Sequence, residues 1–119
     1  MADELVAKLK NATWVGHNPT FDRDFIVDSL NRIGKTPKIQ RRLIDTTTMA
    51  YTAWGLDGEL HLGLDNLREL LHISKDGAHG ALKDALDCRE VFYRSLARRR
   101  GLLARLREWL FGSPTTPTL

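Results

Sequence analysis

The sequence contains one cysteine, Cys88, four prolines and no long hydrophobic segment among its 119 residues. A single cysteine excludes an internal disulfide bond. No window approaches the roughly 18 to 20 consecutive apolar residues that a membrane-spanning helix needs. The first residues, Met-Ala-Asp-Glu, have neither the basic start nor the apolar run of a signal peptide. These absences favour a cytoplasmic protein with no membrane partner.

The residues that are present indicate one small globular domain. Hydrophobic residues make up 42% and charged residues 28% of the chain, which excludes a disordered acidic tail, a collagen-like fibre or a multidomain assembly. The net charge of +3 is uneven, because residues 94–119 carry six arginines and one glutamate, whereas residues 1–93 have a small acidic excess. The basic end suggests contact with phosphate or another anionic surface.

Hydrophobic periodicity and turn residues predict two short strands among a majority of helices. The order strand, helix, strand and then helices indicates an α/β fold with parallel strands. We expect Gly101 to end a long helix and residues 112–119 to form a disordered tail. The predicted elements are helices at 3–10, 18–34, 46–54, 64–71, 81–100 and 101–111, and strands at 13–16 and 41–45.

Two aspartates lie on the apolar faces of predicted helices. On a helical wheel, Asp22 falls in the middle of the apolar arc of its helix. Asp84 falls beside Cys88 on the apolar side of the long helix, whereas Asp87 faces solvent. An ionised carboxylate that faces a core is costly unless it is paired or bound to metal. Either aspartate could instead cap or hydrogen-bond a loop, but two of them at helix starts favour a shared site. The arc around Asp22 consists of Phe21, Phe25, Ile26, Leu30 and Ile33.

His79 lies just before the second of these helices, next to Gly80. A lone histidine is more often structural than catalytic. A histidine five residues before an inward aspartate, at a glycine-flanked helix start, is a candidate general base.

Two longer segments surround these residues. Residues 14–22 read Trp-Val-Gly-His-Asn-Pro-Thr-Phe-Asp, and residues 79–85 read His-Gly-Ala-Leu-Lys-Asp-Ala. In that order, with Leu-Ile-Asp-Thr and Leu-Asp-Asn-Leu between them, they resemble the second and third motifs of the DEDDh 3′–5′ exonucleases. This is the family of the proofreading subunit of bacterial DNA polymerase III, and the resemblance covers about residues 3–97.

The resemblance implies an RNase H-like fold and two Mg²⁺ or Mn²⁺ ions that clamp a terminal phosphodiester. It assigns Asp22 and Asp84 as metal ligands and His79 as the general base. His17 and Asn18 would shape the turn beside the site and contact substrate. The implied substrate is nucleic acid with a 3′ end, most readily single-stranded DNA. Asp45 ends the second strand and is expected to cap the helix that follows.

The family's first motif, Asp-x-Glu on an opening strand, has no counterpart in the sixteen residues before His17. Asp57-Gly58-Glu59 has the right letters, but it follows the second motif in a glycine-rich loop and is rejected. We therefore expect a partial fold with the opening strands missing, in which residues 1–100 form a truncated exonuclease-like domain. Self-association or a polymerase-type partner would cover the unpaired strand edge. The expected function is an incomplete metal-dependent 3′–5′ exonuclease. The alternative is an inactive module that binds nucleic acid or protein.

The basic segment 101–111 leaves three interpretations open. Its leucines recur at helical spacing, which favours a helix packed on the domain with solvated arginines. The arginines would also suit a nucleic-acid contact. A basic amphipathic helix on a membrane surface is a third and weaker interpretation.

Overall fold

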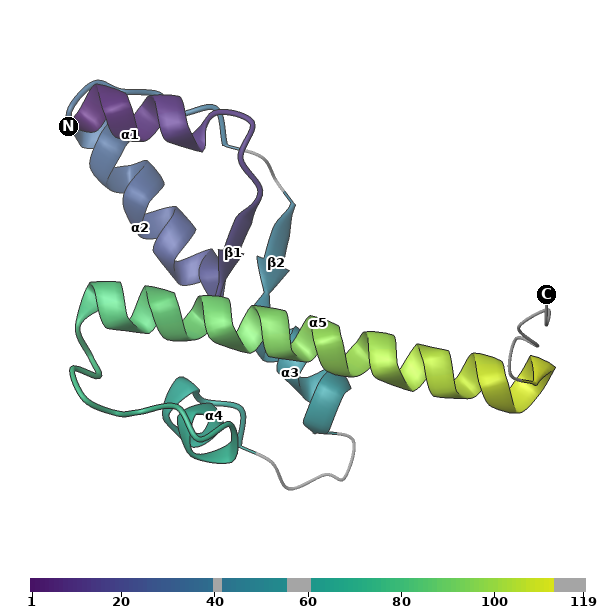
Figure 1. Ribbon diagram of the computed structural model, residues 1–119. Helices are drawn as coiled ribbons and strands as arrows, with labels where there is room; N and C mark the ends of the chain where they lie inside the picture. Colours follow the sequence, from purple (N-terminus) through teal and green to yellow (C-terminus); the bar gives the residue numbers. More distant parts are fainter. Residues whose placement is uncertain (40–41, 56–60, 113–119) are drawn as a thin grey trace, which may run out of the picture.

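The computed structural model describes residues 1–39, 42–55 and 61–112, which form five helices and a sheet of two parallel strands (Figure 1). The predicted class, α/β with short parallel strands and a majority of helices, is confirmed. In the sheet, Trp14, Val15 and Gly16 align with Leu43, Ile44 and Asp45. The elements are α1 (Ala2–Leu9), β1 (Trp14–Gly16), α2 (Pro19–Arg32), β2 (Leu43–Asp45), α3 (Thr46–Trp54), α4 (Leu64–Leu70) and α5 (Ala81–Phe111).

A tight turn carries the chain from β1 into α2. A Cβ atom on Gly16 would lie 2.7 Å from the Cβ of Pro19, so this close approach needs glycine. Asn18 adopts the left-handed conformation with φ of 56°, and Pro19 occupies the first position of α2, where its fixed φ suits a helix. The turn delivers the first turn of α2 to the end of the sheet.

The second strand passes directly into α3 because its last residue is also the helix cap. Asp45 Oδ1 accepts a hydrogen bond from the main-chain N–H of Thr47 at 2.9 Å, and Oδ2 accepts one from the hydroxyl of Thr48 at 3.1 Å. Burial raises the pKa of Asp45, but the hydrogen bonds outweigh it and hold the pKa below its usual value. The expected capping role of Asp45 is confirmed.

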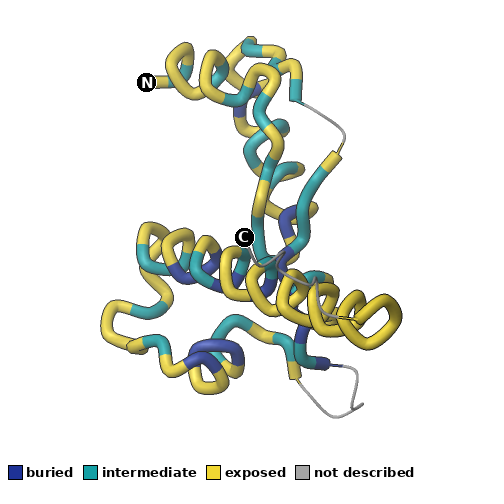
Figure 2. Tube along the Cα trace, turned by 45° about the vertical axis from the view of Figure 1, so that its right-hand side comes forward, coloured by how far each residue is buried: buried dark blue, intermediate teal, exposed yellow. Residues whose placement is uncertain are grey.

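The hydrophobic core lies in the half of the molecule that contains α3, α4 and α5. Its buried members come from all three helices and from the end of α4: Ala50, Leu67, Leu71 and Val91. Trp54, Leu62, Leu64 and Ile73 pack around them, partly buried. In Figure 2 the buried residues gather in this half, whereas α1 and α2 form an arm beyond the sheet with few of them. For α2, only Pro19 and Leu30 are buried.

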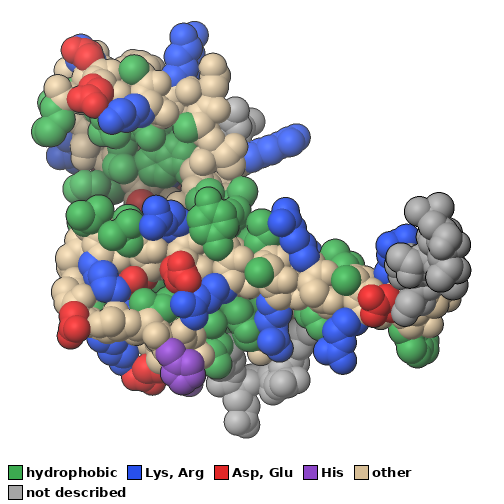
Figure 3. All heavy atoms as spheres, viewed as in Figure 1, with side chains coloured by type: hydrophobic (Ala, Val, Ile, Leu, Met, Phe, Trp, Pro, Cys, Tyr) green, Lys and Arg blue, Asp and Glu red, His purple; other side chains and the backbone are tan. Residues whose placement is uncertain are grey.

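The apolar arc of α2 does not face a core, so that prediction is wrong. Phe21 is 72% exposed, Phe25 is 66% exposed and Ile33 is 60% exposed. The periodicity identified the apolar face correctly, but it cannot show whether another element covers that face. In the described residues, a hollow lined by Leu5 of α1 and by Phe25, Leu30 and Ile33 lies between α1 and α2, so α1 does not close over this face. Hydrophobic side chains are accordingly visible on the arm and at its junction with α5 (Figure 3).

The last helix is continuous from Ala81 to Phe111, so the expected break at Gly101 is also wrong. A single glycine inside a helix costs only about 1 kcal/mol relative to alanine, and the hydrogen-bonded turns on both sides maintain the helix. Residues 97–112 are all exposed, which contradicts the expectation that this segment packs on the domain. It extends away from the body (Figure 1), and near its start Arg98 donates from Nε to the main-chain oxygen of Ala53 and lies over the ring of Trp54.

Three further expectations concern the glycine-rich loop, the C-terminal tail and the absence of a membrane-spanning helix. The predicted loop containing Asp57-Gly58-Glu59 lies outside the described residues, as does nearly all of the predicted tail, from residue 113 onward. Among the helices that are described, none is long and apolar enough to cross a bilayer.

Candidate active site

A hollow of about 520 Å³ lies where the end of β1 meets the first turns of α2 and α5. It brings together three residues that the sequence singled out: His17, Asp22 and Asp84. His79 and Asn18 are not among its lining residues. The rest of the lining is mostly apolar and consists of Val15, Gly16, Ile26, Leu64, Ala81, Ala85 and Cys88.

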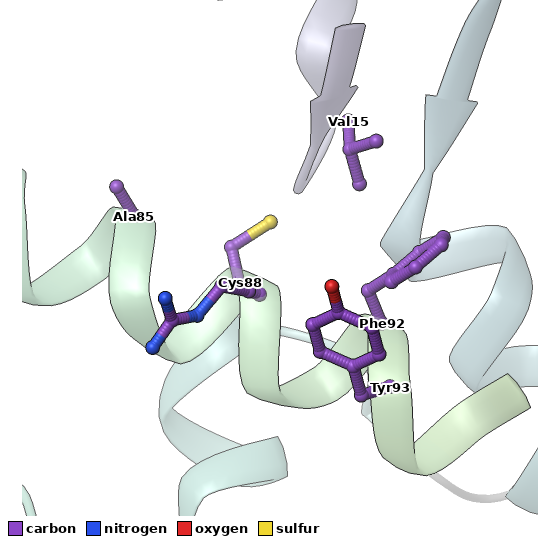
Figure 4. Close-up of a pocket in the computed structure, with 6 residues that line it drawn as sticks. Val15, Ala85, Cys88, Phe92 and Tyr93 are labelled. Atoms are coloured by element: carbon purple, nitrogen blue, oxygen red, sulfur yellow. The ribbon is translucent and has the colours of Figure 1, made fainter. Parts of the chain in front are cut away.

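A second hollow of about 170 Å³ adjoins the first and shares Val15, Ala85 and Cys88 with it. Figure 4 shows this region, with Val15 of β1 above α5 and the ring of Phe92 nearby. Val15 is the middle residue of β1 and is 43% exposed. The edge of the site is therefore apolar, and β2 is the only described neighbour of β1 in the sheet.

Asp22 lies in the first turn of α2, where the helix dipole favours a carboxylate. The wheel predicted that it faces a core, but it is exposed. No described residue donates a hydrogen bond to its side chain or pairs with it, so its oxygens are available to solvent or a ligand in the hollow.

Asp84 occupies the first turn of α5 on the opposite wall, and its side chain is 37% exposed. Its Oδ1 accepts a hydrogen bond from Nη2 of Arg68 at 2.5 Å and another from the main-chain N–H of His79 at 3.1 Å. Asp84 is thus paired with a protein cation. This distinguishes it from Asp22.

The partner of Asp84, Arg68, is a residue that sequence reasoning missed. Its side chain is 1% exposed, and it also donates from Nε to Oδ2 of Asp87 at 2.7 Å and from Nη1 to Oδ1 of Asp65 at 2.6 Å. Burial by itself would lower the pKa of Arg68, but hydrogen bonds to the carboxylates of Asp87, Asp65 and Asp84 raise it above the normal value. The guanidinium therefore stays charged while buried.

The helical wheel placed Asp87 toward solvent, and the structure corrects this. Asp87 is 4% exposed and its Oδ1 accepts a hydrogen bond from Lys83 at 2.5 Å. Burial raises its pKa, but Lys83 and Arg68 outweigh that effect and hold the pKa below the normal value. The error arose because α4 packs on the side of α5 that the wheel treated as free.

His79 lies close to Asp84 through its main chain but not through its ring. Its φ of 68° places it in the left-handed region, which is uncommon for residues other than glycine, although histidine, asparagine and aspartate adopt it more often than the rest. The ring is 80% exposed, and its Nε2 lies 3.8 Å from Oδ2 of Asp65. The structure therefore holds His79 at the start of α5 by its N–H bond to Asp84, with the imidazole outside the hollow.

Thr46 connects the site to the core and was also missed. It is fully buried, and its Oγ1 donates to the main-chain oxygen of Gly16 at 3.1 Å. Oγ1 of Thr46 also lies 3.0 Å from Nδ1 of His17 and 3.5 Å from Sγ of Cys88. Since the single hydroxyl proton goes to Gly16, Nδ1 of His17 must be the donor, and Nε2 of a neutral ring is left as an acceptor.

Two further groups beside the hollow are the main chain of Asn18 and the thiol of Cys88. The main-chain N–H of Asn18 donates to Oδ1 of Asp45 at 3.0 Å, so the left-handed Asn18 contributes its backbone to the β1–α2 turn. Burial raises the pKa of the Cys88 thiol, and Cys88 stays a neutral lining residue at neutral pH.

These donors do not by themselves fit a centre with two divalent ions. No group of three or more His, Cys, Asp or Glu residues that could hold a metal ion is present in residues 1–39, 42–55 and 61–112. Mg²⁺ and Mn²⁺ favour several oxygen ligands, whereas here Asp22 is free and one oxygen of Asp84 is bound to Arg68. No step through a metal ion follows from these residues alone.

The fold and the motifs define an exonuclease-type α/β domain, and comparison with known proteins agrees. The sequence model of the RNase_T exonuclease family matches residues 1–92, and the chain belongs to this family. Its two parallel strands and helix-rich remainder form a partial RNase H-like exonuclease fold.

A curated relative is the DNA polymerase III subunit epsilon of Treponema pallidum (strain Nichols), which is 30% identical over 89 residues. The match covers 75% of this chain and 41% of the relative, so the chain spans less than half the length of that protein. No solved structure matches the chain.

Proposed function

We propose that this chain provides one part of a 3′–5′ exonuclease centre that hydrolyses the terminal phosphodiester of a nucleic acid. The observation that carries the proposal is that Asp22 and Asp84, one from each motif, line the same hollow together with His17. Membership of the exonuclease family supports a nuclease function. The resemblance supplies the direction of cleavage.

In this proposal each residue has a distinct role. Asp22 and Asp84 supply oxygen donors toward Mg²⁺ or Mn²⁺, the divalent ions that exonucleases of this kind usually use. His79 is the base that accepts a proton from the attacking water, and it must turn its exposed ring toward the hollow to do so. His17 and Asn18 shape the turn next to the substrate. The remaining carboxylates come from a second polypeptide segment.

The surface of the site supports a partner that supplies this segment. Val15 on the open side of β1 and the two phenylalanines of α2, Phe21 and Phe25, are exposed beside the hollow. A strand that pairs with β1 would cover them and satisfy the free edge of the sheet. A polymerase-type partner, as the relative's name suggests for that protein, is the source that we propose for this segment, and self-association would cover the edge without supplying the carboxylates.

Single-stranded DNA is the proposed substrate, and the cytoplasm is the proposed compartment. The exposed arginines at the end of α5 would neutralise phosphates outside the cleavage site. We propose that residues 1–100 form the exonuclease-like part and that residues 101–111 act as this accessory contact.

The test is a cleavage assay on DNA labelled at its 5′ end, in Mg²⁺ or Mn²⁺, with the purified chain alone and with a polymerase-type partner added, because the proposal requires carboxylates from a second segment. Progressive shortening from the 3′ end that Asp22→Ala and His79→Ala abolish supports the proposal. Asp24→Ala is the matched control, because Asp24 lies on the same helix, is exposed and pairs only with Arg23 among the described residues. Shortening that survives both site variants contradicts the proposal.

A second candidate function is an inactive module that binds nucleic acid. The observation that favours it is the bond between Arg68 and Asp84, which reduces the negative charge available to a metal. This function predicts no cleavage, together with salt-sensitive DNA binding that Asp22→Ala leaves unchanged and that Arg105→Ala and Arg107→Ala weaken.

A further inference from the structure

A buried guanidinium lies behind the wall of the hollow, and its nitrogens are shared among three carboxylates. The Arg68 side chain is 1% exposed and bridges α4 to two successive turns of α5, through Asp84 and Asp87. Of the two, Asp87 is buried and turned away from the hollow, whereas Asp84 is partly exposed and lines it.

The charges around Arg68 are not evenly balanced. Asp87 is also bound by Lys83, so two cations share its charge. Asp84 has no second cation among the described residues, and its other contact is the main-chain N–H of His79. The positive charge of Arg68 is therefore the principal counter-charge for the Asp84 carboxylate. The hydrogen bond between them joins two ionised groups, and such charge-assisted bonds are stronger than bonds between neutral groups.

We infer that Arg68 is the resident counter-cation of Asp84 and that it lowers the affinity of the hollow for divalent cations, which bind at Asp84 only in competition with the guanidinium. The inference rests on the proposed function, because that function makes Asp84 a cation ligand. Hard cations bind carboxylates according to the negative charge that these present. A guanidinium at hydrogen-bond distance reduces that charge, and it would repel a divalent ion nearby.

The inference is tested by Mn²⁺ binding, followed by electron paramagnetic resonance of the free ion without any nucleic acid. The informative comparison is Asp87→Asn against the double variant Arg68→Met and Asp87→Asn. Both chains lack the buried Asp87 charge and differ only in the guanidinium, and methionine fills most of the arginine stem's volume without charge. Removing one positive charge about 6 Å from a divalent ion in water-like surroundings tightens binding about tenfold.

The outcomes separate the inference from the proposed function. About tenfold tighter Mn²⁺ binding in the double variant, lost when Asp84→Asn is added, supports the inference. Equal or weaker binding in the double variant overturns it, while Mn²⁺ binding that depends on Asp22 keeps the proposed function. Absence of Mn²⁺ binding at Asp22 and Asp84 in every variant overturns both. Circular dichroism establishes that each variant is folded.

A measurement on the unmodified chain decides the matter if the double variant does not fold. Mg²⁺ is added while the side-chain N–H resonance of Arg68 and the main-chain N–H resonance of His79 are followed by NMR. If Mg²⁺ displaces the guanidinium, both resonances shift and saturate with one dissociation constant. A shift at His79 with none at Arg68 overturns the inference, and no shift at either overturns the proposed metal role of Asp84 as well.

Discussion

Replacing Thr46 by valine tests whether the buried hydroxyl group holds the site to the core. Valine has nearly the same shape, so the change removes three polar contacts at Oγ1 without opening a cavity: the bonds to Gly16, His17 and Cys88. The Thr46 side chain is fully buried, whereas Gly16 and His17 are partly buried and line the hollow. The carbonyl of Gly16 and the Nδ1 proton of His17 lose this partner.

The expected magnitude follows from these contacts. A neutral hydrogen bond contributes about 1 kcal/mol, and a buried group left without a partner costs about 1 to 3 kcal/mol. The sulfur contact at 3.5 Å is weak and adds little. We therefore expect Thr46→Val to lower the free energy of unfolding by about 2 to 3 kcal/mol. For a chain of this size, that corresponds to a fall in Tm on the order of 10 °C.

The assay is thermal and urea unfolding followed by circular dichroism. Thr52→Val is the matched control, because Thr52 lies on the same helix, is exposed, and among the described residues its hydroxyl bonds only to the carbonyl of Met49 at 2.9 Å. We expect the control to change stability by less than about 0.5 kcal/mol. A Thr46→Val chain as stable as this control would refute the reasoning, because it would show that Oγ1 makes no net contribution.

Three further predictions concern the backbone and pH. Gly16→Ala should destabilise the fold and shift the first turn of α2, measured by urea unfolding and by NMR, because the new Cβ would lie 2.7 Å from the Cβ of Pro19; unchanged stability and spectra would contradict the close approach. Gly101→Ala should raise the helical signal and stabilise the end of α5 by about 0.5 to 1 kcal/mol, since the added methyl group meets no atom within 4 Å; an unchanged or lower helical signal would argue against a continuous helix there. The pKa of Asp45 is lowered on folding, so its contribution to stability is complete above the unfolded pKa of about 3.9 and is lost as the pH falls through the folded value. Asp45→Asn should therefore flatten the loss of stability below about pH 4 in acid unfolding curves, and a curve of unchanged slope would contradict this assignment.

Local signals in the sequence were sufficient for most of the secondary structure. Asp45 marks the start of α3 through its side-chain cap. The Asn18-Pro19 pair marks the start of α2 because proline suits the first helical position, although the Asn18 side chain makes no capping bond. Gly101 misled because a glycine ends a helix only when it adopts a left-handed or extended conformation, and the sequence does not reveal whether it does. The exposed end of α5 shows a related limit. Apolar residues at helical spacing predict which face of a helix is hydrophobic, but not whether another element packs against that face.

The sequence predicted the two aspartates of the candidate site but not the side chains that bind them. The motif resemblance selected Asp22 and Asp84, and the structure places both at one hollow. The wheel placed Asp87 toward solvent, but it is buried, because burial on α5 depends on where α4 packs. Arg68 lies on α4, sixteen residues before Asp84 on α5. Because the two residues belong to different helices, the hydrophobic periodicity of either helix does not predict that they pair.

The shared partner of Asp84 and Asp87 connects the site to the core of the fold. Asp87 and Asp84 lie one helical turn apart, and a single guanidinium binds both. Packing of α4 on α5 therefore buries Asp87 together with Arg68. The same contact orients the Asp84 carboxylate at the edge of the hollow. A change that loosens α4 would move Asp84 together with the core, whereas Asp22, on the arm beyond the sheet, would keep its position. The two carboxylates of the proposed centre thus belong to separately stabilised parts of the molecule, and a segment paired with β1 and packed on α2 would bring the two parts into one rigid unit.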